Sequence, residues 1–187
     1  MRRAAVTVPE DPASARAAAY AHGLRLLAGR EMAESAVGRR LLDRGFPPAV
    51  ADETVARLVR VGALDDGRAV RAAARTLVAV KLRGRFRAQR ELEAKGFRKE
   101  DAIAALAELL HDTDERDLVE RALDARLCGR RLQADDVPGM RRVYAALVRR
   151  GFAPGIIRDA VLRRVKTAAA DAVPSDAFPP DDDASDV

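Results

Sequence analysis

The sequence predicts an all-α protein, and three observations support this fold class. Strong helix formers such as Ala, Leu, Arg and Glu dominate the 187 residues, whereas aromatic residues make up only 4 %. Apolar residues recur at spacings of three and four, which is typical of one buried helix face. The pattern Leu-x-x-[Lys/Arg]-Gly-Phe occurs three times, and its glycines lie 51 and 55 residues apart. A pattern repeated at near-constant spacing predicts tandem helical modules.

The repeated pattern has the features of a helix C-terminus. It reads LLDRGF at residues 41–46, LEAKGF at 92–97 and LVRRGF at 147–152. The Leu lies on the last helical turn, and the basic residue lies near the negative end of the helix dipole. The Gly can adopt the left-handed conformation that ends a helix, after which the Phe returns to the core. Pro48 and Pro154 are then placed in the first turn of the next helix.

Spacing from these glycines predicts the helices of each module. Positions twelve, eight and four residues before each Gly begin and line a middle helix: Ala33, Val37, Leu41; Gly84, Ala88, Leu92; Gly139, Val143, Leu147. Positions nine and thirteen residues after each Phe line a third helix: Val55, Val59; Leu106, Leu110; Val161, Val165. A first helix in each module has its own apolar stripe: Tyr20, Leu24, Leu27; Val70, Ala73, Leu77, Val80; Val119, Leu123, Leu127.

The expected helix starts carry capping residues. Asp11 followed by Pro12 reads as an N-cap and a first helical position, and Asp65 with Asp66 as a cap for the first helix of the second module. The third module is expected to open near Thr113.

These elements predict three three-helix modules at residues 14–63, 64–111 and 112–165. Modules near 50 residues have thin cores, so neighbours must support each other, and we expect an elongated array, either straight or curved. Residues 1–13 are expected to form a flexible arm. Residues 166–187 contain three prolines and six Asp and are expected to form a disordered acidic tail.

Charge indicates an anionic partner. The net charge is +5, but residues 1–165 hold 33 basic and 23 acidic residues, a net of +10. A basic surface favours nucleic acid, an acidic protein face or membrane headgroups. Only four of the 34 basic residues are Lys. Codon preference in a GC-rich genome is an alternative explanation for the Arg bias, but it does not explain the net charge.

The basic clusters are the main functional signal in the sequence. The candidate partner-binding or DNA-binding residues are Arg39, Arg40, Arg44, Arg83, Arg85, Arg87, Arg90, Lys95, Arg141, Arg142, Arg149 and Arg150. The alternative for any one of them is a solvated helix face neutralised by Asp and Glu. Few aromatic side chains are available to stack on bases, which argues against a dedicated single-strand binder.

Catalytic, cofactor and metal sites are not expected. No Gly-rich phosphate loop is present. His22 reads as an ordinary helix residue, the acidic residues after His111 as a helix boundary, and Cys128 as a small buried residue rather than a reactive thiol. The lone cysteine fits a reducing cytosol, and neither a signal peptide nor an 18-residue apolar run is evident. We therefore expect a non-enzymatic cytoplasmic protein.

Taken together, the motifs resemble the RecX family of recombination regulators. The three turns, the GALDD segment at residues 62–66, the stretch at 84–97, Glu115 and the segment from Tyr144 to Phe152 carry the resemblance, which covers about residues 15–165. The sequence departs from the family pattern in two places. Ala69 and Val70 stand where a Phe-Ala pair is usual, and Ala33 replaces a frequent capping Ser.

The resemblance implies a function in DNA recombination, repair and the SOS response. It implies binding to the RecA recombinase and its filament on single-stranded DNA, with inhibition of ATPase, strand exchange and filament growth. Direct DNA contact would be secondary, no membrane is involved, and we expect a monomer. The alternatives are a helical DNA-binding module or a protein scaffold without recombinase specificity. A separate hypothesis is that residues 181–183 fold over the basic body and weaken its encounter with anionic partners.

Overall fold

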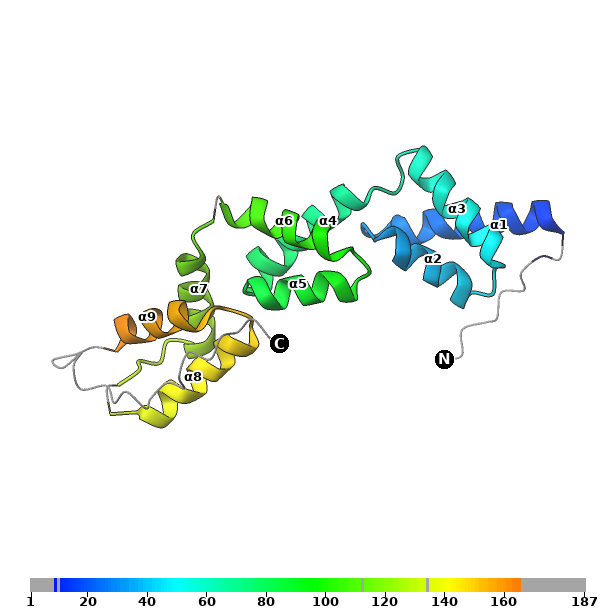
Figure 1. Ribbon diagram of the computed structural model, residues 1–187. Helices are drawn as coiled ribbons and strands as arrows, with labels where there is room; N and C mark the ends of the chain where they lie inside the picture. Colours follow the sequence, from blue (N-terminus) through cyan, green and yellow to red (C-terminus); the bar gives the residue numbers. More distant parts are fainter. Residues whose placement is uncertain (1–8, 10, 112, 134, 166–187) are drawn as a thin grey trace. The chain divides into compact units, whose positions relative to one another are not determined.

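The computed structural model describes residues 9, 11–111, 113–133 and 135–165, and regular structure within them is entirely helical (Figure 1). The helices, in chain order, are α1 (Pro12–Leu27), α2 (Glu34–Asp43), α3 (Pro48–Arg60), α4 (Asp66–Arg75), the π-helical segment η1 (Thr76–Val80), α5 (Arg85–Ala94), α6 (Lys99–His111), α7 (Glu115–Leu127), α8 (Val137–Arg149) and α9 (Pro154–Arg164). The all-α prediction is confirmed. The proposed acidic tail lies outside the described residues, as does most of the proposed arm.

Contacts divide the chain into two compact units. Unit 1 comprises Met1–Ala73 and Leu92–Ala105, and unit 2 comprises Ala74–Glu91 and Leu106–Val187. The division passes through α4, α5 and α6, so the module boundaries expected from the sequence remain a prediction.

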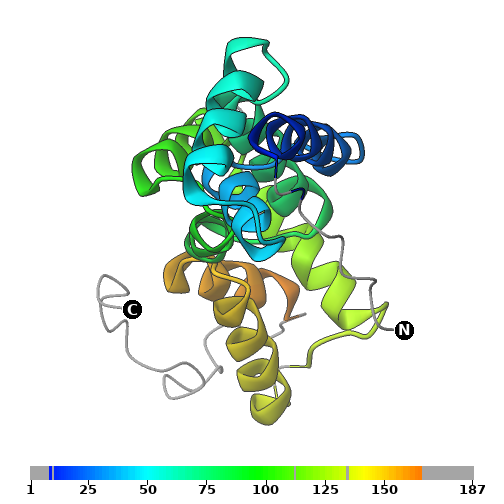
Figure 2. The ribbon, with the colours of Figure 1, turned by 90° about the vertical axis from the view of Figure 1, so that its right-hand side faces the viewer.

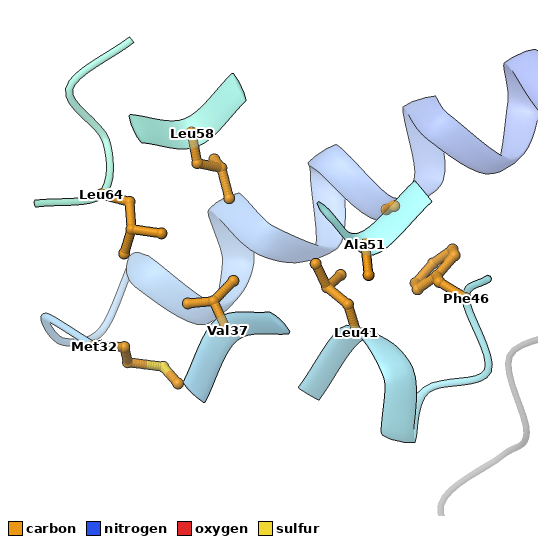
Figure 3. Packing of buried hydrophobic residues seen from close by; sticks show 8 residues of the cluster. Met32, Val37, Leu41, Phe46, Ala51, Leu58 and Leu64 are labelled. Atoms are coloured by element: carbon orange, nitrogen blue, oxygen red, sulfur yellow. The ribbon is translucent and has the colours of Figure 1, made fainter. Parts of the chain in front are cut away.

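The core of unit 1 is built where α1 packs against α3 and α2. Its buried cluster consists of Ala19, Met32, Val37, Leu41, Phe46, Ala51, Leu58 and Leu64 (Figure 3). Small residues form the buried face of α1, since Ala15, Ala19 and Gly23 recur at a spacing of four and are all buried. A Cβ on Gly23 would lie 2.7 Å from Leu58 Cδ1, so a side chain at this position would require Leu58 to shift.

The buried face of α1 differs from the one predicted from Tyr20, Leu24 and Leu27. Leu24 is 41 % exposed, and Tyr20 and Leu27 are half-buried. The prediction followed the large side chains, whereas the small ones on the adjacent face make the helix contact. The ring of Tyr20 instead makes a cation–π contact with Arg57, whose guanidinium carbon lies 4.0 Å from the ring centroid.

The stripe on α3 is also rotated from its predicted face. Val59 is 39 % exposed and Val55 is half-buried, whereas Ala51, Thr54 and Leu58 are buried. The third helices of the later repeats follow the prediction more closely. Leu106, Val161 and Val165 are buried there, and Leu110 is half-buried.

All three Gly-Phe turns form as predicted. Gly45, Gly96 and Gly151 have φ angles of 96°, 100° and 87°. In each turn, the Phe N–H donates to the carbonyl of the motif Leu at 3.2–3.4 Å. The Gly N–H donates to the carbonyl of the residue after that Leu at 2.8 Å. This pair of bonds is the Schellman motif, and it places each Phe in the core, where Phe46, Phe97 and Phe152 are buried. Pro48 and Pro154 begin α3 and α9, as expected.

Two of these turns lie against the start of an earlier middle helix. Within unit 1, the Ser35 hydroxyl donates to the Gly96 carbonyl at 2.6 Å. Within unit 2, the Phe86 N–H donates to the Gly151 carbonyl at 3.2 Å, and the Gly84 N–H donates to the Arg150 carbonyl at 2.8 Å. Ser35 and Phe86 each stand ten residues before the Gly of their own repeat, so the same position meets the next Gly carbonyl in both repeats, through a hydroxyl in one and a backbone N–H in the other.

The paired aspartates cap two different helices. Asp65 Oδ1 accepts from the Arg68 N–H at 2.8 Å, which is the predicted cap of α4. Asp66 Oδ1 accepts from the Glu34 N–H at 2.8 Å, at the start of α2. Since the N-cap residue Ala33 has no side-chain acceptor, Asp66 supplies from α4 an acceptor for one of the free N–H groups in the first turn of α2. Asp11 caps α1 through the Ser14 N–H, and Pro12 is the first helical residue, as predicted.

The π-helical turn η1, which extends α4, changes which residues of this helix are buried from those that the sequence predicted. The Lys81 N–H bonds the Thr76 carbonyl at 3.1 Å, five residues back. The wider turn brings Leu77 and Val78 into the core and leaves Val80 76 % exposed, although the stripe predicted Val80 to be buried. Val70 is buried as expected and Ala73 is half-buried.

In unit 2, α7, α8 and α9 pack against one another (Figures 1 and 2). Val119 and Leu123 are buried as predicted and Leu127 is half-buried. Asp114 caps α7 through the Arg116 N–H at 2.9 Å, and Asp136 caps α8 through the Gly139 N–H at 2.8 Å. No helix in the described part of the chain is both long and apolar enough to cross a bilayer.

Candidate binding surface

In unit 1, four of the predicted basic residues lie on or beside α2. Arg39, Arg40 and Lys95 are exposed and Arg44 is half-buried. A Cβ on Gly96 would lie 2.8 Å from Arg39 Nη2, so the Arg39 side chain lies against the turn that Lys95 precedes. The fold therefore brings Arg39 and Lys95 together from positions 56 residues apart in the sequence.

A second cluster of unit 1 surrounds His22. Burial lowers the pKa of His22, and the positive charges of Arg44, Arg25 and Arg40 lower it further. The imidazole ring lies 6.3 Å from the Phe46 ring, centroid to centroid. His22 is thus an uncharged packing residue among cations at neutral pH. Arg25 was missing from the predicted set, and its position three residues after His22 on one helix is the signal that would have found it.

In unit 2, residues 81–90 carry five basic and no acidic side chains. Glu91 follows them and pairs with two, since its Oε1 lies 3.0 Å from Arg83 Nε and 2.9 Å from Arg87 Nε. Burial raises the pKa of Glu91, but the hydrogen bond from Arg87 and the charge of Arg83 outweigh it, and the pKa is lowered overall. Glu91 therefore partly neutralises Arg83 and Arg87, while Lys81, Arg85 and Arg90 are exposed.

Arg150 makes an intramolecular contact that the sequence did not indicate. Its Nη1 donates to the carbonyls of Lys81 and Leu82 at 3.3 and 3.4 Å, just beyond η1. The half-buried guanidinium thus satisfies carbonyl groups at a helix end and helps hold residues 81–82. The other predicted residues of α8, Arg141, Arg142 and Arg149, are exposed.

An open pocket of about 570 Å³ lies beside Arg85 in unit 2, lined also by Ala107, Leu110, His111, Thr113, Asp114 and Glu115. Burial raises the pKa of Glu115, with the charge of Arg85 acting in the opposite direction. Among the described residues, no group of three His, Cys, Asp or Glu side chains is arranged to hold a metal ion. Cys128 was expected to be buried, but it is exposed at the end of α7, where it adopts the left-handed conformation.

Comparison with known proteins identifies the family. Residues 19–58 match the sequence model of the first three-helix domain of RecX. A regulatory protein RecX from Trichlorobacter lovleyi is 36 % identical over 142 residues, which span 74 % of this chain and 90 % of the relative. The chain belongs to the RecX family. Its members are regulatory proteins rather than enzymes, and the resemblance inferred from the Gly-Phe turns is confirmed.

Further relatives support RecX membership along most of the chain. A regulatory protein RecX from Mycobacterium sp. strain JLS is 31 % identical over 158 residues, covering 82 % of this chain and 85 % of the relative. The crystal structure of RecX from Lactobacillus salivarius has the same fold. It matches with a TM-score of 0.65 and 17 % sequence identity over 79 % of this chain and 95 % of that one.

Proposed function

We propose that the protein binds the RecA recombinase and its filament on single-stranded DNA and inhibits its ATPase, strand exchange and filament growth. Membership of the RecX family carries this proposal, because the similarity extends over 90 % of the Trichlorobacter lovleyi relative. In this proposal direct contact with DNA is secondary to contact with the recombinase. The protein would act as a cytoplasmic monomer.

The exposed basic side chains supply the chemistry that an anionic filament requires. Of the twelve predicted residues, those with exposed side chains are Arg39, Arg40, Lys95, Arg85, Arg87, Arg90, Arg141, Arg142 and Arg149. Glu91 partly neutralises Arg87 and the half-buried Arg83, and Arg150 is engaged with backbone carbonyls. We therefore expect the strongest effects on partner binding from the exposed residues that Glu91 does not pair.

The repeated turn contact supports the proposed modules at residues 14–63, 64–111 and 112–165. Gly96 accepts from Ser35, and Gly151 accepts from Phe86, so the second and third turns each contact the middle helix of the proposed preceding module. The middle helix of the last module is capped by Asp136 of its own module instead. The third middle helix therefore carries its own cap, whereas the first two each meet a later turn.

The test is a titration of recombinase ATPase on single-stranded DNA with this protein at fixed moderate salt. We expect inhibition well below one protein per recombinase. Charge reversal of Arg39 and Arg40 together should raise the half-inhibitory concentration by about fivefold or more. Reversal of Arg116 and Arg126 together, two exposed residues of α7 outside the predicted set, is the matched control. An unchanged ATPase rate at equimolar protein would contradict the proposal.

A further inference from the structure

Phe86 differs from the other phenylalanines that the structure describes. The rings of Phe46, Phe97 and Phe152 are buried, whereas Phe86 is 43 % exposed at the second position of α5. Its backbone N–H donates to the Gly151 carbonyl at 3.2 Å, which holds this position within unit 2. A large apolar ring is therefore presented to solvent from a fixed backbone, and the core does not account for it.

Basic residues lie close to Phe86 along the chain. Arg85 and Arg87 flank Phe86 in sequence, and Arg90 lies one helical turn further along the same face of α5. Residues 81–90 carry five positive charges, and Glu91 offsets one of them. Arg85 and Arg90 are both exposed, so their guanidinium groups are accessible one residue before and four residues after Phe86.

We propose that Phe86 is a stacking platform for a base of single-stranded DNA, with Arg85 and Arg90 contacting the adjoining phosphates. Exposed aromatic rings among cations bind single strands without sequence preference, because every base presents a π-face. The excess of positive charge at this surface favours a polyanion over an apolar protein pocket. The inference rests on the proposed function, and it assigns a stacking role to one of the few aromatic side chains of the chain.

The first test measures the affinity for a labelled oligothymidylate by fluorescence anisotropy, without recombinase. Phe86→Leu keeps an apolar side chain but removes the π-face, and it should weaken binding by about 5- to 150-fold. Val148→Ala, which trims another exposed apolar residue of unit 2, should leave the affinity unchanged. Arg90→Gln should reduce the slope of log affinity against log salt by about 0.7.

A second test detects stacking directly. The chain has no Trp, so Phe86→Trp introduces a unique fluorophore that a stacked base should quench. Val61→Trp, at an exposed position of unit 1, is the control and should show little quenching.

Three results would overturn the proposal. They are wild-type affinity for Phe86→Leu, no quenching of Phe86→Trp when anisotropy reports a bound oligonucleotide, and no oligonucleotide binding by the wild-type protein at low salt. If Phe86→Leu retains oligonucleotide affinity but loses inhibition of recombinase ATPase, Phe86 contacts the recombinase instead. In that case the proposed function stands and the stacking assignment fails.

Discussion

Gly84 and Gly151 lie against each other without room for a side chain on either. The Gly84 N–H donates to the Arg150 carbonyl at 2.8 Å. A Cβ on Gly84 would fall inside van der Waals distance of the carbonyl carbon and oxygen of Gly151, and one on Gly151 would meet the backbone nitrogen of Arg87. The third turn is thereby fixed against the start of α5, which is the helix that carries Phe86.

Replacing Gly84 by Ala tests this contact without changing a left-handed residue. Because the clash is with backbone atoms, neighbouring side chains cannot relieve it, and we expect the free energy of unfolding to fall by about 1–3 kcal/mol. Urea denaturation measures the effect. Gly155→Ala is the control, since a Cβ there meets nothing within 4 Å. Equal stability of the two variants would show that the backbones separate at little cost.

Gly151 and Gly62 separate conformational strain from steric contact. Both have positive φ, at 87° and 70°, but a Cβ on Gly62 meets nothing within 4 Å. Each Gly→Ala change should cost about 1–2 kcal/mol for the left-handed conformation. Gly151→Ala should lose more, because it also clashes with the backbone of Arg87. The comparison is made by urea denaturation, and matched losses would leave the left-handed conformation as the whole cause.

Local signals in the sequence predicted the turns and most helix starts. A Gly between a basic residue and a Phe fixes three features together, namely the left-handed residue, the helix end and the buried ring. Asp11 and Asp65 were likewise recognisable as caps, because Asp is a preferred N-cap residue. In the structure each accepts from a backbone N–H three residues later in the chain.

Features that depend on tertiary contact were not predictable in this way. The approach of Gly23 to Leu58 makes small residues the buried face of α1, against the expectation from side-chain size. The π-helical turn shifts Val80 out of the core with no marker in the local sequence. At the candidate binding surface, cation density was visible, but the pairing by Glu91 and the exposed ring of Phe86 required coordinates.

Asp66 should respond to substitution differently from its neighbour Asp65. Asp66→Ala removes the acceptor for the Glu34 N–H and should cost about 1 kcal/mol of unfolding free energy, whereas Asp66→Asn retains an acceptor. Burial raises the pKa of Asp66, so its contribution to stability is present below the ordinary pKa and is lost as pH rises through the folded-state pKa. We therefore expect Asp66→Asn to be at least as stable as wild type at neutral pH.

Asp65→Asn is the matched control for this effect. The hydrogen bond from the Arg68 N–H lowers the pKa of Asp65, so its contribution is present above the ordinary pKa and is lost as pH falls. Asp65→Asn should therefore lose stability relative to wild type at neutral pH and approach it in acid. Urea titrations across the acidic range compare the two variants, and pH profiles of the same sign would contradict the assignment.

Glu91 should limit the affinity of unit 2 for polyanions, because it pairs with both Arg83 and Arg87. Glu91→Gln should raise oligothymidylate affinity at low salt and steepen the slope of log affinity against log salt by up to about 0.7, measured by anisotropy. The pKa of Glu91 is lowered overall, so its contribution to stability is present above the ordinary pKa and lost on acidification. The variant should therefore be less stable than wild type at neutral pH.

Glu53→Gln is the control for the effect on affinity, because it removes the same charge from an exposed pair with Arg16 in unit 1. An equal gain in affinity from Glu53→Gln would assign the effect to net charge and not to the residues around Phe86.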